Sequence, residues 1–261
     1  MSRTVKAVIA GAVIFGVGVV ILLVTGLATG FKFDDGGNWE MKSYTCEQQV
    51  NTVKLDFSAD ALEVMFYDGD EIKVEYPERK NITTQCSVHD GTLTVSSEVH
   101  FRVRIWWFNK IPTTKIYIPK SMQLNYKIEV DAGALNFGEG GSYGNVSIRL
   151  NAGAINMGDV TCGDFRLELN AGAINFSKLV CDKFDSDVSA GALNVKSLQC
   201  DDVKLDVSAG SAKLGIVGAK SDYTIHVDKS AGSCNVSSQS GGSKRLRVDI
   251  SAGSVSINFD K

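Results

Sequence analysis

The feature of this sequence that most constrains its fold is an internal repeat. The pair Ala-Gly returns at spacings of 19 to 22 residues, and the residues around it repeat as Ser/Asn-Ala-Gly-Ala, apolar, Asn, apolar. Self-similarity at such a fixed period is typical of solenoids, in which each repeat buries its apolar face only against its neighbours. The repeat alanines are Ala132, Ala152, Ala171, Ala190, Ala209, Ala231 and Ala252.

Within each repeat the hydrophobic period is two. From Phe165 to Ala171 every second residue is apolar, which predicts a half-buried strand. After Gly172 the phase slips, and a glycine at that point predicts a sharp bend. A decayed copy at Ser58–Val64 extends the pattern toward the N-terminus. We therefore expect an all-β, single-stranded β-helix (β-solenoid) with coils of about 19–22 residues.

Stacked coils predict ladders of equivalent residues along the solenoid axis, because neighbouring strands lie about 4.8 Å apart. The sequence predicts two apolar ladders and one of asparagines, whose amides can hydrogen-bond from coil to coil. The first apolar ladder is Ile128, Ile148, Leu167, Ser186 (its one polar member), Leu205 and Val248. The second is Leu135, Ile155, Ile174 and Leu193, and the asparagines are Asn136, Asn156, Asn175, Asn194 and Asn235.

Residues 7–29 form an uncharged apolar run, which is long enough for one transmembrane helix. Arg3 and Lys6 precede this run, so the positive-inside rule predicts a cytoplasmic N-terminus and an exported remainder. The alternative is a signal peptide cleaved near Ala28-Thr29-Gly30, although the run is longer than the usual apolar region of such peptides. We expect a single-pass protein of the cell membrane with an extracellular C-terminal domain.

The chain then divides by composition into successive parts. Residues 1–6 are the expected cytoplasmic N-terminus, 7–29 the transmembrane helix and 30–45 a polar tether. Residues 46–130 are expected to form irregular β coils or a cap, continuous with regular solenoid repeats over 131–261. The net charge of −3, without a basic tract, argues against nucleic acid as a partner.

Three of the six cysteines share one position of the repeat. Cys162, Cys181 and Cys200 are each 19 residues apart, so they should stack in consecutive coils. We interpret them as a structural stack of small buried side chains, because they lack the spacing and companions of a metal site. Cys46 and Cys86, in the less regular part, are a candidate disulfide in an oxidising compartment.

The sequence points to no catalytic, cofactor-binding or metal-binding residue. Outward-facing charges form columns, and Asp187 and Asp206 on adjacent coils could in principle serve as the carboxylate pair of a glycosidase. The acidic column, however, lies beside a mostly basic one, as on an ordinary soluble sheet surface. We therefore predict that the protein is not an enzyme.

One segment has the composition of a binding site. Between residues 101 and 108 the period of two places Arg102, Arg104, Trp106 and Phe108 on one face, with exposed aromatic rings beside two arginines. Such composition is favoured in interaction hot spots and at membrane interfaces. The alternative is that this segment caps one end of the solenoid.

These motifs together resemble a bacterial family known as putative adhesins, which are domains of unknown function common in Gram-positive bacteria. The resemblance covers residues 50–259 and rests on fold motifs: residues 53–60, 68–76, 91–95 and 114–120, followed by the Ala-Gly coils. It implies a single-stranded β-helix and carries over no catalytic residue. Some members resemble accessory proteins encoded near envelope-stress signalling systems.

Three functions follow as hypotheses. The first is a non-enzymatic, adhesin-like binding protein or envelope-stress accessory, with a membrane sensor protein or a wall polymer as partner. The second is a self-assembling, bactofilin-like scaffold in which solenoid ends pair edge to edge. The third is a carbohydrate-active β-helix enzyme, which the charge pattern disfavours. No cofactor is implied by any of the motifs.

Overall fold

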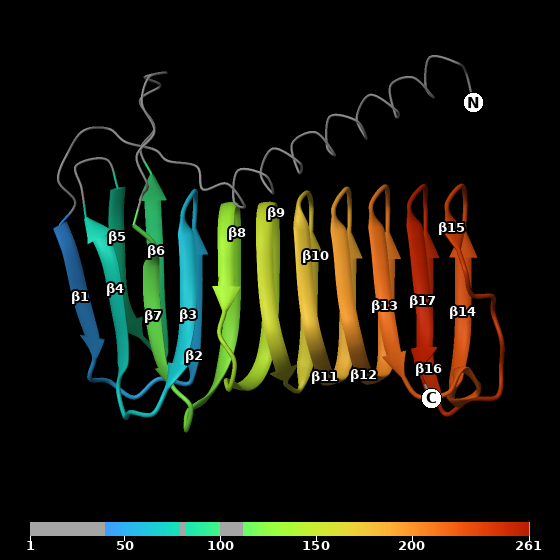
Figure 1. The fold of residues 1–261 in the computed structure, drawn as a ribbon, viewed down its shortest axis with the longest axis horizontal. Helices are drawn as coiled ribbons and strands as arrows, with labels where there is room; N and C mark the ends of the chain where they lie inside the picture. The colour runs from blue at the N-terminus through green and yellow to red at the C-terminus, as the bar shows by residue number, and fades with distance from the viewer. Residues whose placement is uncertain (1–39, 79–81, 100–111, 261) are drawn as a thin grey trace, which may run out of the picture.

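The computed structural model describes residues 40–78, 82–99 and 112–260, and these form one 17-stranded sheet wound into coils (Figure 1). One short 3-10 helix, η1 (Lys220–Asp222), interrupts the strands. The strands are β1 (Glu40–Cys46), β2 (Thr52–Phe57), β3 (Ala61–Tyr67), β4 (Ile72–Glu78), β5 (Ile82–His89), β6 (Thr92–Val99), β7 (Thr114–Pro119), β8 (Gln123–Phe137), β9 (Ser142–Thr161), β10 (Asp164–Leu169), β11 (Ala173–Val188), β12 (Ala192–Val207), β13 (Ser211–Val217), β14 (Tyr223–Lys229), β15 (Ser233–Cys234), β16 (Lys244–Ile250) and β17 (Ser254–Asp260).

The repeats stack in register as parallel strands, which confirms the all-β coils expected from the sequence. Strands β8, β9, β10, β11 and β12 align equivalent residues of successive repeats. The predicted first apolar ladder runs unbroken, from Ile128 through Ser186 to Val248. Its apolar members are at most 1% exposed, and Ser186, equally buried, bonds through Oγ to the Lys204 carbonyl. The ladders therefore form a continuous core along the axis.

The repeat glycines lie where the backbones of neighbouring coils touch. A Cβ on Gly153 would lie 2.0 Å from the Gly133 carbonyl oxygen, and a Cβ on Gly172 would lie 2.2 Å from that of Gly153. Both Gly153 and Gly172 also have positive φ, at 126° and 114°. Any side chain would push the coils apart, so the glycine follows from stacking as well as from the bend.

The coils at both ends are not stacked in chain order. The last coil, β16 and β17, lies between β12–β13 and β14–β15, as Figure 1 shows by the red strands between orange ones. Likewise, β2 and β3 lie between β8 and β6–β7. The prediction that Asn235 continues the asparagine ladder is therefore wrong: Asn194 is followed by Lys213 and Ser256, and Asn235 bonds to the Ile257 backbone.

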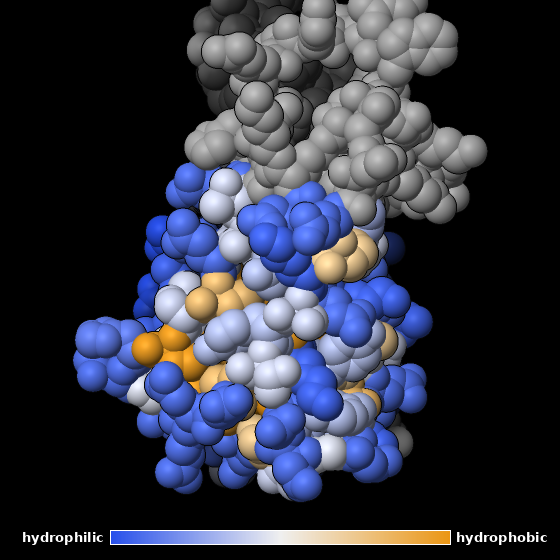
Figure 2. Space-filling view, turned by 90° about the vertical axis from the view of Figure 1, so that its left-hand side faces the viewer, coloured by the Kyte–Doolittle hydropathy of each residue, from blue (hydrophilic) through white to orange (hydrophobic). Residues whose placement is uncertain are grey.

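The two ends of the solenoid differ. At the N-terminal end the sheet changes to antiparallel pairing, with β4 beside β7, β1 beside β4 and β5 beside β6. Figure 2 looks onto this end and shows apolar side chains surrounded by hydrophilic ones. At the C-terminal end a return of the chain covers the edge of β14, where Ile225 and Gln239 exchange backbone hydrogen bonds of 2.8 and 2.9 Å.

The predicted transmembrane helix, residues 7–29, and most of the tether lie outside the described residues. Within the described ranges, no helix has the length and apolarity needed to cross a membrane. The proposed division at residue 130 stays a prediction, although strand β8 already carries the regular register from Tyr126, after a shift that follows Leu124.

Candidate binding surface

The outward charge columns form ion pairs between and within coils. Asp187 and Asp206 are register partners on β11 and β12, yet Lys204 lies beside that column, 2.7 Å from the Asp206 carboxylate and 3.6 Å from that of Asp185. Arg149 approaches Glu168 at 2.7 Å on neighbouring coils. Alternating charges of this kind keep a flat sheet surface soluble, and neither of the two principal pockets lies over them.

Histidines and acids are dispersed over the described part of the chain. His89 lies at the tip of the β5–β6 hairpin, 3.1 Å from Asp90, while His226 lies at the opposite end on β14. Among the residues described, no group of three or more His, Cys, Asp or Glu is arranged to hold a metal ion. The candidate ligand sites are therefore the concave regions of the molecule.

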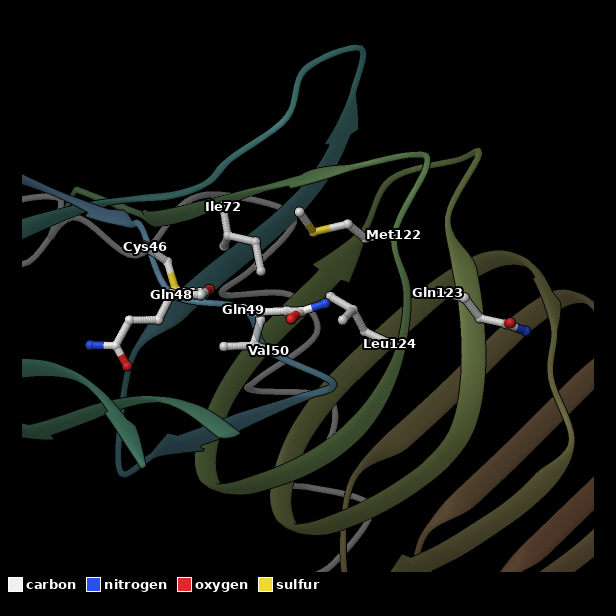
Figure 3. A pocket seen from close by; sticks show the side chains of 8 residues that line it. All are labelled: Cys46, Gln48, Gln49, Val50, Ile72, Met122, Gln123 and Leu124. Atoms are coloured by element: carbon white, nitrogen blue, oxygen red, sulfur yellow. Dashed lines mark hydrogen bonds between the residues drawn. The ribbon is translucent and has the colours of Figure 1, made fainter. Parts of the chain in front are cut away.

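The first pocket lies at the N-terminal end, where the chain enters β2 and β8. It has a volume of about 210 Å³, and its wall is mainly apolar with glutamines at its rim. In Figure 3 the Gln123 side chain lies apart from the other labelled side chains. The lining residues are Cys46, Gln48, Gln49, Val50, Ile72, Met122, Gln123 and Leu124.

A second pocket, of about 390 Å³, adjoins the first because Gln123 lines both. It follows one corner of the coils along the solenoid axis. Backbone hydrogen bonds join this corner from coil to coil, from Asn125 to Asn51, from Gly163 to Gly144 and from Asp182 to Gly163. The lining residues are Gln123, Asn125, Tyr143, Gly144, Asn145, Thr161, Cys162, Gly163 and Asp182. We call the two pockets together the corner groove.

Side-chain amides build the wall of the corner groove. The Asn125 carbonyl oxygen accepts the backbone N–H of Asn145 at 2.8 Å, and the Asn145 carbonyl oxygen accepts that of Asp164 at 2.9 Å. These bonds fix each amide in place, so the exposed Asn145 presents its NH₂ group outward at a rigid position. With the hydroxyl of Thr161 and the carboxylate of Asp182, the groove offers polar groups repeated at the coil spacing of about 4.8 Å.

Of the three stacked cysteines, Cys162 lines the corner groove, and Cys181 and Cys200 continue the stack in the next coils. Cys181 and Cys200 are register partners, and the Cys162 N–H bonds to the Val180 carbonyl at 3.0 Å. All three are at most 9% exposed. Hydrogen bonds to Cys162 and Cys200, followed by burial, raise the pKa of the Cys181 thiol. A protonated, buried thiol packs as a small apolar side chain.

Cys46 and Cys86 lie on β1 and β5, at the N-terminal end, and both are free in the structure. Burial raises the pKa of the Cys86 thiol to about 12, which makes it a poor nucleophile for disulfide exchange. Their pairing stays a prediction. The aromatic candidate site, Arg102, Arg104, Trp106 and Phe108, lies outside the described residues.

Sequence reasoning missed the corner groove, although a signal for it exists. A polar residue, asparagine or aspartate, lies one position before the first alternating residues of successive coils, at Asn51, Asn125, Asn145 and Asp164. The interval between Asn125 and Asn145 equals that of the repeat alanines. These asparagines belong to the repeat just as the Ala-Gly pair does, and they mark the corner that the groove follows.

Comparison with known proteins agrees with this architecture. The Toastrack DUF4097 family matches residues 50–261. A putative adhesin from Parabacteroides distasonis is similar in structure, with a TM-score of 0.51 and 15% identity over 87% of this chain and 99% of that chain. A putative adhesin from Parabacteroides merdae has a TM-score of 0.49 and 12% identity over 87% and 99%. No curated protein matches the chain.

Proposed function

The chain belongs to the Toastrack DUF4097 family, whose function is unknown, and on that premise we propose that it is a non-enzymatic binding protein of the cell envelope. Its ligand is an extended, uncharged polymer such as a wall glycan, held along the corner groove. Residues 7–29 anchor it in the cell membrane, with the N-terminus cytoplasmic and the solenoid outside.

The observation that carries this proposal is the shape and chemistry of the corner groove. The groove runs along the axis over successive coils and is lined by amide, hydroxyl and carboxylate groups, with the buried ring of Tyr143 beneath them. Hydrogen-bonding groups, among them the single carboxylate of Asp182, together with a few apolar contacts suit polyhydroxylated ligands, because every buried hydroxyl needs a partner. An extended β-1,4-linked glycan repeats its hydroxyls along a straight line, as the coils repeat their amides.

The membrane location rests on the sequence. The uncharged run of residues 7–29 follows Arg3 and Lys6 and precedes Lys32, Asp34 and Asp35. This charge distribution favours a cytoplasmic N-terminus. An anchored solenoid would hold its groove close to the outer face of the membrane, within reach of wall polymers.

Binding can be tested with the full-length protein in detergent. Cosedimentation with purified peptidoglycan sacculi and calorimetry with chito-oligosaccharides measure the two forms of the expected ligand. We expect Thr161→Arg, which places a long charged side chain in the groove, to weaken binding about tenfold, since roughly 1.4 kcal/mol corresponds to that factor. Ser177→Arg, also at an exposed strand position but away from the groove, should bind like the wild type.

Each outcome supports or contradicts a different part of the proposal. Retention of the wild type but not of Thr161→Arg supports the groove as the binding site. Equal weakening by Thr161→Arg and Ser177→Arg would place the ligand elsewhere. Absence of binding to sacculi and to oligosaccharides would overturn the glycan proposal, and release of soluble sugars would overturn the assignment as a non-enzyme.

A further inference from the structure

The N-terminal end of the solenoid has an unpaired strand edge. Within the described residues β1 pairs only with β4, and β5 pairs only with β6. In one layer the strands are ordered β3, β7, β4 and β1 toward the N-terminal end. In the facing layer the order is β2, β6 and β5, so this layer is one strand shorter. Among the described strands β1 is therefore the outermost, and the N–H and C=O groups on its side away from β4 bond to no other described strand.

The surface of β1 is exposed and partly apolar. Met41 is 51% exposed and is one of two large hydrophobic side chains that stand out on the described surface. Glu40 and Lys42 flank it, and Lys42 forms an ion pair with Glu78 on β4. The strand contains no proline and pairs with β4 without a bulge, so two of the features that prevent edge-to-edge pairing are missing, and its charges at Glu40 and Lys42 must be matched by any partner strand.

We propose that β1 pairs antiparallel with β1 of a second copy, with Met41 on the two-fold axis. In this register Glu40 of each copy faces Lys42 of the other, so the charges complement each other and the two Met41 side chains meet. A register centred on Lys42 would instead place two lysines opposite each other, which is unfavourable. The interface is isologous, as expected for a two-fold dimer.

Two further features of the chain favour a second copy as the occupant. At the other end the edge of β14 is covered, because Gln239 pairs with Ile225 and its side chain bonds to the Lys220 and Tyr223 carbonyls, so that edge is not open to a further copy. The chain also enters β1 at Glu40, beside the proposed axis. Both tethers would then start next to each other and lead to one membrane, a point that rests on the proposed anchor.

Cysteine cross-linking of the full-length protein in detergent tests the register. Met41→Cys should form a covalent dimer on mild oxidation, because the two residues oppose each other across the axis at a distance that a disulfide can span. Thr45→Cys is the matched control: it is exposed on the same face of β1, but it lies four positions from the axis. We expect about tenfold more dimer from Met41→Cys, and equal yields or none would overturn the proposal.

A charge change tests the same contact without cysteine. Glu40→Lys should raise the dimer dissociation constant about tenfold, because it places a positive charge opposite Lys42 of the other copy, where the wild type has a negative one. Light scattering after size exclusion measures the mass, and circular dichroism verifies folding. A wild-type monomer, a dimer insensitive to Glu40→Lys, or longer oligomers would each overturn the inference. Glycan binding by a monomeric protein would leave the proposed function intact and would contradict the proposed dimer.

Discussion

The middle coils and the N-terminal end of the solenoid use the same corner position in different ways. In the middle coils this position is glycine, and a Cβ on Gly153 would strike the Gly133 backbone of the preceding coil. In the first coil the position is Asp60, whose carboxylate accepts a hydrogen bond from the Ser97 hydroxyl on β6. Glycine is therefore required where the corner of a neighbouring coil fills the space that a Cβ would occupy. A side chain is accepted where the neighbour at that position is a strand, as β6 is for Asp60.

The largest expected effect comes from filling a middle corner. Gly153→Ala adds a Cβ that meets the Gly133 oxygen at 2.0 Å, in a residue with φ of 126°. Backbone strain and overpacking together should lower the free energy of unfolding by about 3–5 kcal/mol. Urea denaturation followed by circular dichroism measures this change.

Gly241→Ala is the matched control for that substitution. Gly241 also has positive φ, at 113°, but a Cβ there would meet nothing within 4 Å. Strain alone should then cost about 1–2 kcal/mol. If the two variants were equally stable, contact between coil corners would not be the reason for the repeat glycine.

Core truncations should destabilise the middle coils more than the N-terminal end. Leu167→Ala removes a side chain 1% exposed from the middle of the first ladder and should cost about 2–4 kcal/mol. Val88→Ala, at an inward-facing but only partly buried position of β5, should cost less than about 1 kcal/mol. Thermal unfolding of both variants measures the difference. A larger loss for Val88→Ala would mean that the N-terminal end is packed as tightly as the middle.

Asp60 should make the N-terminal end sensitive to pH. Burial, opposed only partly by the hydrogen bond from Ser97, raises the pKa of Asp60 above its ordinary value of 3.8, and its second oxygen has no partner. A carboxyl whose folded-state pKa is raised stabilises the fold below pH 3.8, and this contribution is lost as the pH rises through the folded-state value.

Asp60→Asn removes this titration, so it should raise stability at pH 7 by roughly 1–3 kcal/mol and give no gain near pH 3. Unfolding free energies of the wild type and Asp60→Asn, measured between pH 3 and pH 7, test the direction of this stability change. Asp206→Asn, on the exposed charged face, serves as the control and should not reproduce the same slope. A wild type that gains stability as the pH rises, relative to Asp60→Asn, would contradict the expected protonation.

The sequence predicts the middle of the molecule better than its ends, and the reason is physical. Register follows from the repeat, so the ladders of Ile128 and Leu135 could be written down in advance. Coil order could be predicted only in part: the apolar ladder set Val248 beside Leu205, as found, but the asparagine ladder set Asn235 beside Asn194, where packing instead inserts the last coil, β16 and β17. The asparagines of the repeat mark the corner of the coils, but the depth of the corner groove depends on the backbone path, which the sequence pattern does not give.

The smallest expected effect concerns the exposed asparagines of the regular coils. Asn156 donates to Asn136 and accepts from Asn175, both at 3.0 Å, whereas Asn194 takes part in no such side-chain bond in the described structure. Exposed hydrogen bonds contribute little, so Asn156→Ala should cost about 0.5–1 kcal/mol and Asn194→Ala close to nothing. Chemical denaturation of both variants, with the same baseline slopes, can resolve this difference. Equal values would show that the amides stack without stabilising the fold. A ladder whose amide bonds join only three of its four consecutive asparagines would then be a consequence of the repeat rather than a cause of its regularity.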